Sequence, residues 1–150
     1  MSIFAELRAG LATRSAAETQ TIAQRLALAL PPDATLALHG DLGVGKTTFV
    51  QGLARGLGVT EAVTSPTFNI FTLHRGNGRT LLHLDAYRLE NDRQIDSLML
   101  EDFLVSPYCL AVEWPEKIAA WLPVDTLHLT LRIDGAQHHH VQLEPFNKNS

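Results

Sequence analysis

The amino-acid sequence predicts an α/β fold in three layers, with helices on both faces of a mixed central sheet and antiparallel strands at the edge of that sheet. Three observations lead to this prediction. A glycine-rich loop stands between an apolar run and a helical pattern, two further apolar runs end in acids, and apolar and polar residues alternate near the C-terminus. With 150 residues, of which 45% are hydrophobic and 19% charged, the chain is expected to form one compact domain over residues 1–150.

The glycine-rich loop, Gly40–Thr47, has the spacing G-x-x-x-x-G-K-[ST] of a phosphate-binding loop. The apolar residues 35–39 predict a strand before it, and residues 48–53 predict a helix after it. Glycines let such a loop turn its backbone N–H groups toward a polyphosphate. Lys46 can then reach the β and γ phosphates, and the Thr47 hydroxyl can join the ligands of a Mg²⁺ ion. The sequence therefore predicts a nucleotide-binding domain of the P-loop NTPase type.

Two long helices are predicted. Ser15 begins an S-x-x-E capping box, which starts a helix over about residues 16–30. The phosphate-loop helix is expected over about residues 46–57. Because glycine is unfavourable inside a helix, Gly52 and Gly56 indicate close packing on that side.

The middle of the chain predicts a hairpin followed by short helical turns and a buried strand. The hairpin strands are expected over residues 68–73 and 81–85, joined by a turn at residues 76–78. Residues 91–104 are rich in carboxylates and predict short helical turns. Residues 109–112 form an apolar run that predicts a buried strand.

Near the C-terminus, apolar and polar residues alternate over residues 127–133. Asp134-Gly135 predicts a turn toward a second strand at residues 141–143. This pattern is typical of an antiparallel pair with one solvent-facing side.

Two acids stand where strands are predicted to end. Asp85 follows one apolar run and Glu113 follows another. Ligands of open α/β sheets collect at the carboxyl ends of the strands, which is also where the phosphate loop opens. Nucleotide-bound Mg²⁺ usually takes one protein carboxylate, and hydrolysis needs a group that orients the attacking water. The alternative for either acid is a structural one, in which it caps a loop or pairs with Arg88 or Lys117.

Four motifs in series give the chain a family resemblance. They are Gly-Asp-Leu-Gly-Val-Gly-Lys-Thr-Thr at 40–48, Ser-Pro-Thr-Phe at 65–68, His-Leu-Asp-Ala-Tyr-Arg-Leu at 83–89 and Val-Glu-Trp-Pro-Glu at 112–116. In this order and spacing they closely resemble the bacterial TsaE (YjeE) family, the ATPase component of tRNA threonylcarbamoyladenosine synthesis. The resemblance covers nearly the whole chain. It implies a P-loop α/β fold, Mg²⁺-dependent ATP binding with slow hydrolysis, and action with the partner proteins TsaB and TsaD, through which tRNA is reached indirectly.

The resemblance also implies roles for individual residues. Asp85 would be the acid at the hydrolysis site, assisted by Lys46, and Thr47 with Glu113 would bind Mg²⁺. The segment Ser65-Pro66-Thr67 resembles the family's switch region, the alternative being a rigid turn set by Pro66. The residues expected to contact ATP are Leu42, Gly43, Val44, Gly45, Lys46, Thr47, Thr48, Ser15, Thr19 and Trp114.

The chain departs from the family pattern at two places. Where the family commonly has glycine after its acidic helix, this chain has Met99 or Leu100. Near the C-terminus, where relatives often carry glycine and arginine, it has Gln137-His138-His139-His140. A metal site there could use only His138 and His140, because neighbouring residues of a strand face opposite sides, and a solvated strand is the favoured alternative.

Composition argues against several other classes of protein. The longest apolar stretches are far shorter than the roughly 20 residues of a membrane span, and the N-terminus lacks the features of a secretory signal, so a cytoplasmic protein is expected. Cys109, the only cysteine, lies in an apolar run and is expected to be buried rather than reactive. A net charge of −4 and a pI near 5.9 argue against a broad nucleic-acid surface.

Two other functions fit a phosphate loop. A small-molecule kinase needs arginines that clamp the transferred phosphate, whereas here only Arg88 and Arg93 lie close together near an acid. A nucleotide-gated binding module, in which hydrolysis is incidental, would use the same residues as a weak ATPase. The sequence therefore leaves both alternatives beside the ATPase.

Overall fold

The computed structural model describes residues 2–41, 43–64, 66, 70–135 and 138–145. Its elements in chain order are α1 (Ile3–Ala9), β1 (Leu11–Thr13), α2 (Ala16–Ala29), β2 (Ala34–His39), α3 (Lys46–Gly56), β3 (Phe71–Arg75), β4 (Thr80–Asp85), α4 (Asp92–Ser97), the 3-10 helix η1 (Leu100–Asp102), β5 (Tyr108–Glu113), the 3-10 helix η2 (Pro115–Ile118), β6 (Leu127–Ile133) and β7 (His139–Leu143). The predicted α/β class is confirmed.

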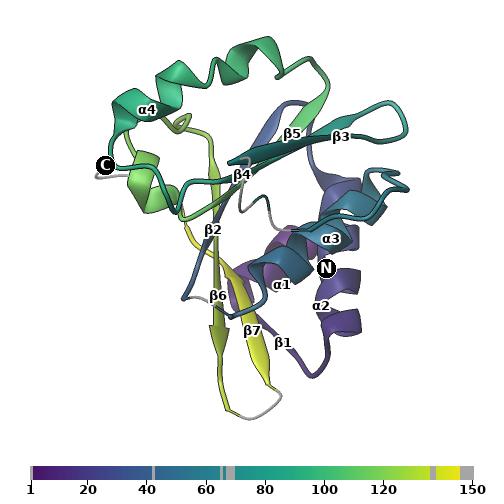
Figure 1. Cartoon of the computed structure of the whole chain (residues 1–150). Helices are drawn as coiled ribbons and strands as arrows, with labels where there is room; N and C mark the ends of the chain where they lie inside the picture. Colours follow the sequence, from purple (N-terminus) through teal and green to yellow (C-terminus); the bar gives the residue numbers. More distant parts are fainter. Residues whose placement is uncertain (1, 42, 65, 67–69, 136–137, 146–150) are drawn as a thin grey trace.

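The strands form one mixed sheet in the order β1-β7-β6-β2-β5-β4-β3 (Figure 1). Its centre is parallel, because β2 pairs in parallel with both β5 and β6, and β5 with β4. The flanking pairs β3–β4, β6–β7 and β1–β7 are antiparallel. The predicted hairpin, the predicted C-terminal pair and the antiparallel edges are therefore all present.

The two faces of the sheet have separate hydrophobic cores. On one face, leucines of β2 such as Leu36 and Leu38 pack with α3 residues such as Phe49 and Leu53, all fully buried. On the other face, β4 and β5 pack under α4, η1 and η2 through a second cluster that includes Leu84. Figure 1 shows α2 and α3 side by side on one face and α4 on the other. The three layers follow from this division.

Helix α2 begins and packs as the sequence predicts. The Ser15 side chain accepts a hydrogen bond from the Glu18 N–H at 3.1 Å, as in a capping box. Against α2, a Cβ on Gly52 would lie 2.3 Å from the Gln20 carbonyl oxygen, and one on Gly56 would lie 2.6 Å from the Ala27 Cβ. The close packing expected at both helix glycines is confirmed.

Some features differ from the sequence-based expectations. Helix α1 and strand β1 were not predicted, since each is short and β1 is defined by its pairing with β7. The first hairpin strand is described from Phe71 rather than residue 68, and residues 67–69 lie outside the described part. Met99 has a left-handed backbone with φ 52° and ψ 45°, a conformation that glycine adopts more easily.

Candidate functional site

The phosphate-loop segment connects the end of β2 to the start of α3. Gly45 is the N-cap of α3 with φ 98°, a left-handed value that glycine tolerates. Gly40 has φ 144°, and a Cβ there would lie 2.4 Å from the Leu131 carbonyl oxygen. Glycine is therefore required at both ends of the loop, for conformation and for space. The loop leads directly into the N-terminus of α3, which has no side-chain cap, and the first N–H groups of a helix are an arrangement that binds anions.

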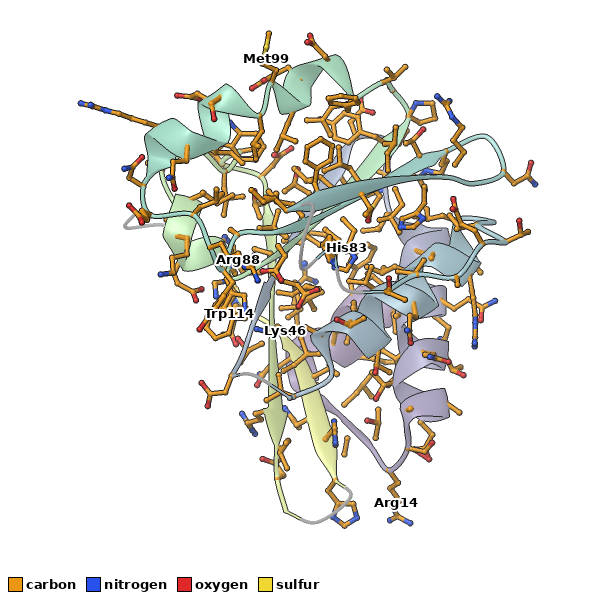
Figure 2. The ribbon with its side chains drawn as sticks, in the orientation of Figure 1. Arg14, Lys46, His83, Arg88, Met99 and Trp114 are labelled. Carbon is orange, nitrogen blue, oxygen red and sulfur yellow. The ribbon has the colours of Figure 1, made fainter. Side chains whose placement is uncertain are left out.

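Lys46 is nearly buried, with 5% of its surface exposed. Its Nζ donates a hydrogen bond to the Gly40 carbonyl oxygen at 2.8 Å and lies 3.8 Å from the centre of the Trp114 ring (Figure 2). Burial lowers the pKa of Lys46, whereas the carboxylates of Glu113 and Glu116 act to raise it. The ammonium group is thus held inside the loop, between a carbonyl and an aromatic face.

Glu113 ends β5 directly beside the first turn of α3. One of its carboxylate oxygens, Oε2, accepts a hydrogen bond from the Thr47 hydroxyl at 3.5 Å and a much shorter one from Nε2 of His83 at 2.6 Å. Glu113 is 5% exposed and His83 is fully buried. A hydroxyl and a carboxylate oxygen at this spacing are hard donors of the kind that suit Mg²⁺.

Asp85 ends β4 and is the register partner of Glu113 on the neighbouring strand. Its negative charge acts on Lys46, together with that of Glu113. Its Oδ1 also accepts a hydrogen bond from the Tyr87 N–H at 3.0 Å, and the Tyr87 ring lies 5.1 Å from that of Trp114. Asp85 therefore takes part in a local turn while standing at the same end of the sheet as the phosphate loop.

The other predicted site residues fall into three groups. Val44 is buried, whereas Gly43 is exposed and Thr48 half-buried. Ser15 and Thr19 have structural partners, since Ser15 caps α2 and the Thr19 hydroxyl lies 2.7 Å from that of buried Thr13. The last group lies outside the described residues and comprises Leu42, Ser65 and Thr67.

Pro66, the described residue of the predicted switch segment, is buried. Its carbonyl oxygen accepts a hydrogen bond from the Ile70 N–H at 3.0 Å. Ile70 has φ 65°, and its own carbonyl accepts a hydrogen bond from the Asp85 N–H at 2.7 Å. The end of this segment is therefore tied to the strand that carries Asp85.

Sequence patterns did not single out His83 or His139 as site residues. His83 is buried in β4, and its hydrogen-bond partner is the site carboxylate Glu113. The signal in the sequence for a site role of His83 was its position two residues before Asp85, on the same face of β4.

His139 lies against the phosphate loop, because a Cβ on Gly45 would be 3.5 Å from Nδ1 of His139.

The C-terminal histidines do not form the expected solvated strand. Strand β7 starts at His139, so His138 precedes it, while His139 and His140 are half-buried. Nδ1 of His140 is buried without a hydrogen-bond partner in the described structure. Among the described residues, no group of three or more histidine, cysteine or acidic side chains could hold a metal ion.

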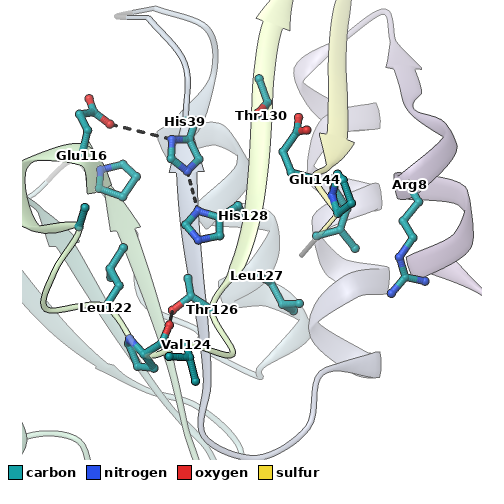
Figure 3. Close-up of a pocket in the computed structure, with 15 residues that line it drawn as sticks. Arg8, His39, Glu116, Leu122, Val124, Thr126, Leu127, His128, Thr130 and Glu144 are labelled. Carbon is teal, nitrogen blue, oxygen red and sulfur yellow. Dashed lines mark hydrogen bonds and ion pairs between the residues drawn. The ribbon is translucent and has the colours of Figure 1, made fainter. Parts of the chain in front are cut away.

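A cavity of about 750 Å³ lies beside the end of β2, and its lining includes His39, Glu116 and His128 (Figure 3). Nε2 of His39 lies 2.8 Å from Nδ1 of His128, and Nδ1 of His39 lies 4.0 Å from the Glu116 carboxylate. Burial lowers the pKa of both histidines, while Glu144 acts to raise both. His39 is the last residue of β2 and directly precedes the phosphate loop.

Two further observations concern residues outside the candidate site. The Cys109 thiol is buried as expected, and this burial raises its pKa to about 12. In the described part of the chain, no helix is long and apolar enough to cross a membrane.

Comparison with known proteins gives consistent matches. The family described as Threonylcarbamoyl adenosine biosynthesis protein TsaE matches residues 13–141. The tRNA threonylcarbamoyladenosine biosynthesis protein TsaE of Bacillus subtilis (strain 168) is 38% identical, over 79% of this chain and 73% of the relative. The protein of the same name from Streptomyces coelicolor is 44% identical, over 77% of this chain and 78% of the relative.

The fold comparison agrees with the sequence comparison. The crystal structure of Bacillus subtilis YdiB superposes with a TM-score of 0.76 and 32% identity, covering 93% of this chain and 86% of that one. The predicted P-loop NTPase-type fold is thereby confirmed. Since the family match spans most of the sequence and relatives above 30% identity are covered over more than two thirds of their length, this chain belongs to the TsaE family.

Proposed function

We propose that this protein is a Mg²⁺-dependent ATP-binding protein with slow ATPase activity, which supports the formation of threonylcarbamoyladenosine in tRNA. We further propose that it is one P-loop ATPase domain of the cytoplasm and works with TsaB and TsaD. Membership of the TsaE family supports the pathway, because the curated relatives carry tRNA threonylcarbamoyladenosine biosynthesis in their names. The partners and the nucleotide chemistry belong to the proposal.

The observation that carries the ATPase proposal is the meeting of four side chains at one end of the sheet. Lys46 and Thr47 begin α3, and Thr47 is hydrogen-bonded to Glu113. Asp85 is the neighbour of Glu113 in the sheet register. A cation for the phosphates, two oxygens for Mg²⁺ and a second carboxylate for the attacking water therefore come from three adjacent elements.

Each residue has a role that its position supports. The N–H groups at the start of α3 and the Lys46 ammonium bind the phosphates, once Nζ exchanges the Gly40 carbonyl for phosphate oxygens. Thr47 and Glu113 would hold Mg²⁺, which supplies charge neutralisation at the β and γ phosphates. The Asp85 carboxylate accepts a hydrogen bond from the attacking water, orients it and accepts its proton.

Calorimetric titration with ATP and Mg²⁺ tests nucleotide binding. Since hydrogen bonds between charged groups contribute about 1.5–3 kcal/mol, Lys46→Ala should raise the Kd for ATP by about 10- to 100-fold. Lys117→Ala is the matched control, because Lys117 is exposed on η2. Equal affinities of wild type and Lys46→Ala would overturn the proposed nucleotide site.

Hydrolysis of ATP labelled at the γ-phosphate tests the reaction. Asp85→Asn should lower the rate by about 100-fold or more while leaving ATP affinity nearly unchanged. Asp96→Asn, at an exposed position of α4, is the control. Release of the label as inorganic phosphate supports an ATPase, whereas its appearance on a metabolite would replace the proposal with a kinase.

The partner proposal has its own test. Co-purification of the protein with TsaB and TsaD, with ATP, with a non-hydrolysable analogue and without nucleotide, should show association that depends on nucleotide. Full multiple-turnover formation of threonylcarbamoyladenosine with the analogue would favour a nucleotide-gated module over an ATPase. Absence of association under all three conditions would contradict the proposed partners.

A further inference from the structure

His83 makes the shortest contact of the Glu113 carboxylate. Nε2 of His83 lies 2.6 Å from Oε2 of Glu113, compared with 3.5 Å for the Thr47 hydroxyl. Because a carboxylate only accepts, Nε2 carries a proton and donates it. The register explains the contact. His83 is aligned with Ala111 on β5, two residues before Glu113, so both side chains leave the same face of the sheet.

Within the described part of the chain, the rest of the imidazole ring has no polar contact. His83 is fully buried, and its Nδ1 has no hydrogen-bond partner among the residues that the structure describes. An unpartnered polar atom in the interior costs stability, and an apolar side chain of similar size would avoid that cost. Among the described residues, the benefit of histidine at this position therefore comes through its hydrogen bond to Glu113.

Glu113 needs a partner of this kind in order to bind a cation. Its side chain is only 7% exposed, and a buried carboxylate is costly unless it accepts hydrogen bonds. A short bond to a ring that is itself fixed in the core also restricts the carboxylate to one orientation. Outer partners that orient a metal ligand in this way commonly change metal affinity by about 10- to 100-fold.

We propose that His83 is a positioning residue, which holds the Glu113 carboxylate in the orientation that binds Mg²⁺ together with Thr47 and thereby sets the affinity for the cation. This inference rests on the proposed function, which assigns Glu113 and Thr47 to the cation. It gives His83 a role in cation affinity and none in the binding of metal-free nucleotide.

The test compares two substitutions of His83 in the full chain. His83→Leu fills the space without a donor, whereas His83→Gln keeps an N–H near the position of Nε2. His74→Leu is the matched control, because His74 is also buried and lies on the neighbouring strand β3 of the same hairpin. Electron paramagnetic resonance of free Mn²⁺, used in place of Mg²⁺, measures the bound cation in the presence of ATP. Calorimetry in EDTA measures the affinity for metal-free ATP.

We expect His83→Leu to weaken Mn²⁺ binding by about 10-fold or more, with metal-free ATP affinity within about two-fold of wild type. His83→Gln should recover most of the Mn²⁺ affinity, and His74→Leu should leave it unchanged. Wild-type Mn²⁺ affinity in a folded His83→Leu protein would overturn the inference. So would equal weakening in His74→Leu or no recovery in His83→Gln, since both would indicate general core damage.

Failure of the proposed function would look different. If wild type itself bound no Mn²⁺ with ATP, or if Glu113→Gln bound it as tightly as wild type, the assignment of the cation ligand would be wrong. In that case the comparison between the His83 variants would have no cation site to report on, and the inference would fall with the assignment.

Discussion

Two contacts between a histidine and a glutamate lie on opposite faces of the same sheet, close to the phosphate loop. His83 and Glu113 are 2.6 Å apart, with side chains 0% and 7% exposed. His39 and Glu116 are 4.0 Å apart, with side chains 33% and 54% exposed. The residue types are the same, but the first contact is fixed inside the core, while the second lies in an open cavity where water screens it.

The difference comes from the elements that carry each pair. His83 and Glu113 belong to adjacent parallel strands beneath α3, so the sheet register fixes their separation. Glu116 lies on the short 3-10 helix η2, where its side chain extends into solvent. The same pair of residue types thus makes a fixed contact between His83 and Glu113 and a loose one between His39 and Glu116. Of the two contacts, the fixed one is suited to orienting a carboxylate that binds a metal ion.

The largest predicted effect compares the two glutamates directly. Glu113→Gln should lower Mg²⁺-dependent ATP hydrolysis by about 100-fold, because it weakens the cation site. Glu116→Gln should leave the rate within about two-fold, since an exposed ion pair contributes about 0–1 kcal/mol. Steady-state assays over a Mg²⁺ series measure both. Comparable losses in the two variants would remove the functional distinction between the faces.

The next prediction concerns the turn between α4 and η1, which cover the sheet face opposite α2 and α3. The β4–β5 half lies under α4 and η1, and Met99 joins these two elements in a left-handed conformation. Met99→Gly should raise the free energy of unfolding by about 1 kcal/mol, because the backbone strain of a side chain there costs roughly 1–2 kcal/mol. Denaturant melts measure the gain. A loss of stability would show that the exposed methionine side chain contributes more than its strain costs.

A smaller effect follows from the His39–His128 pair. Burial lowers the pKa of both side chains in the folded protein, so the unfolded chain takes up their protons first on acidification. The contribution of this pair to stability is therefore complete above about pH 6.5 and is lost as the pH falls below that value. His128→Gln should make the loss between pH 7 and pH 5 shallower, as measured by denaturant melts.

The control for this pH series is His138→Gln, since His138 is exposed. Its pH profile should match that of wild type. If the unfolding free energy of His128→Gln varied with pH as steeply as that of wild type, His128 would titrate alike in the folded and unfolded states. The two faces of the sheet would then not differ in this electrostatic contribution to stability.

The smallest effect concerns the pKa of Lys46, on which carboxylates from both faces of the sheet act. Glu113 and Glu116 both act to raise its pKa, Glu113 more strongly. Removing either carboxylate should therefore lower the pKa of Lys46, with the larger change in Glu113→Gln. The alkaline limb of ATP affinity against pH should move to lower pH in the same order. The reverse order would indicate that Glu116 lies closer to Lys46 in solution.

Much of the fold could be predicted because local patterns and pairing agree. The capping box at Ser15 and the spacing of Gly40–Thr47 determine local backbone geometry, so both helices appear where expected. Strand β1 could not be predicted, because three residues carry no periodicity and only their pairing with β7 makes them a strand. Met99 could not be predicted either, since nothing local marks a methionine for a left-handed turn.

The site was predictable in its residues but not in its contacts. The placement of Asp85 and Glu113 at neighbouring strand ends follows from apolar runs that stop at an acid. The contact between His83 and Glu113 depends on the order of strands in the sheet, which the sequence does not specify. The position of His139 against Gly45 likewise depends on β7 lying beside β6. Such contacts join residues that are distant in the chain.

The bond between Lys46 and the Gly40 carbonyl has a consequence for discrimination among anions. The Lys46 ammonium has an acceptor and an aromatic neighbour within the protein, so an incoming anion has to displace an existing bond. A lone inorganic phosphate has several acceptor oxygens but spans fewer of the donors of the loop at once than a triphosphate does, so it gains less from the exchange. A triphosphate engages Lys46 and the helix amides at the same time, so the exchange becomes favourable, and we expect the protein to prefer a triphosphate over free inorganic phosphate.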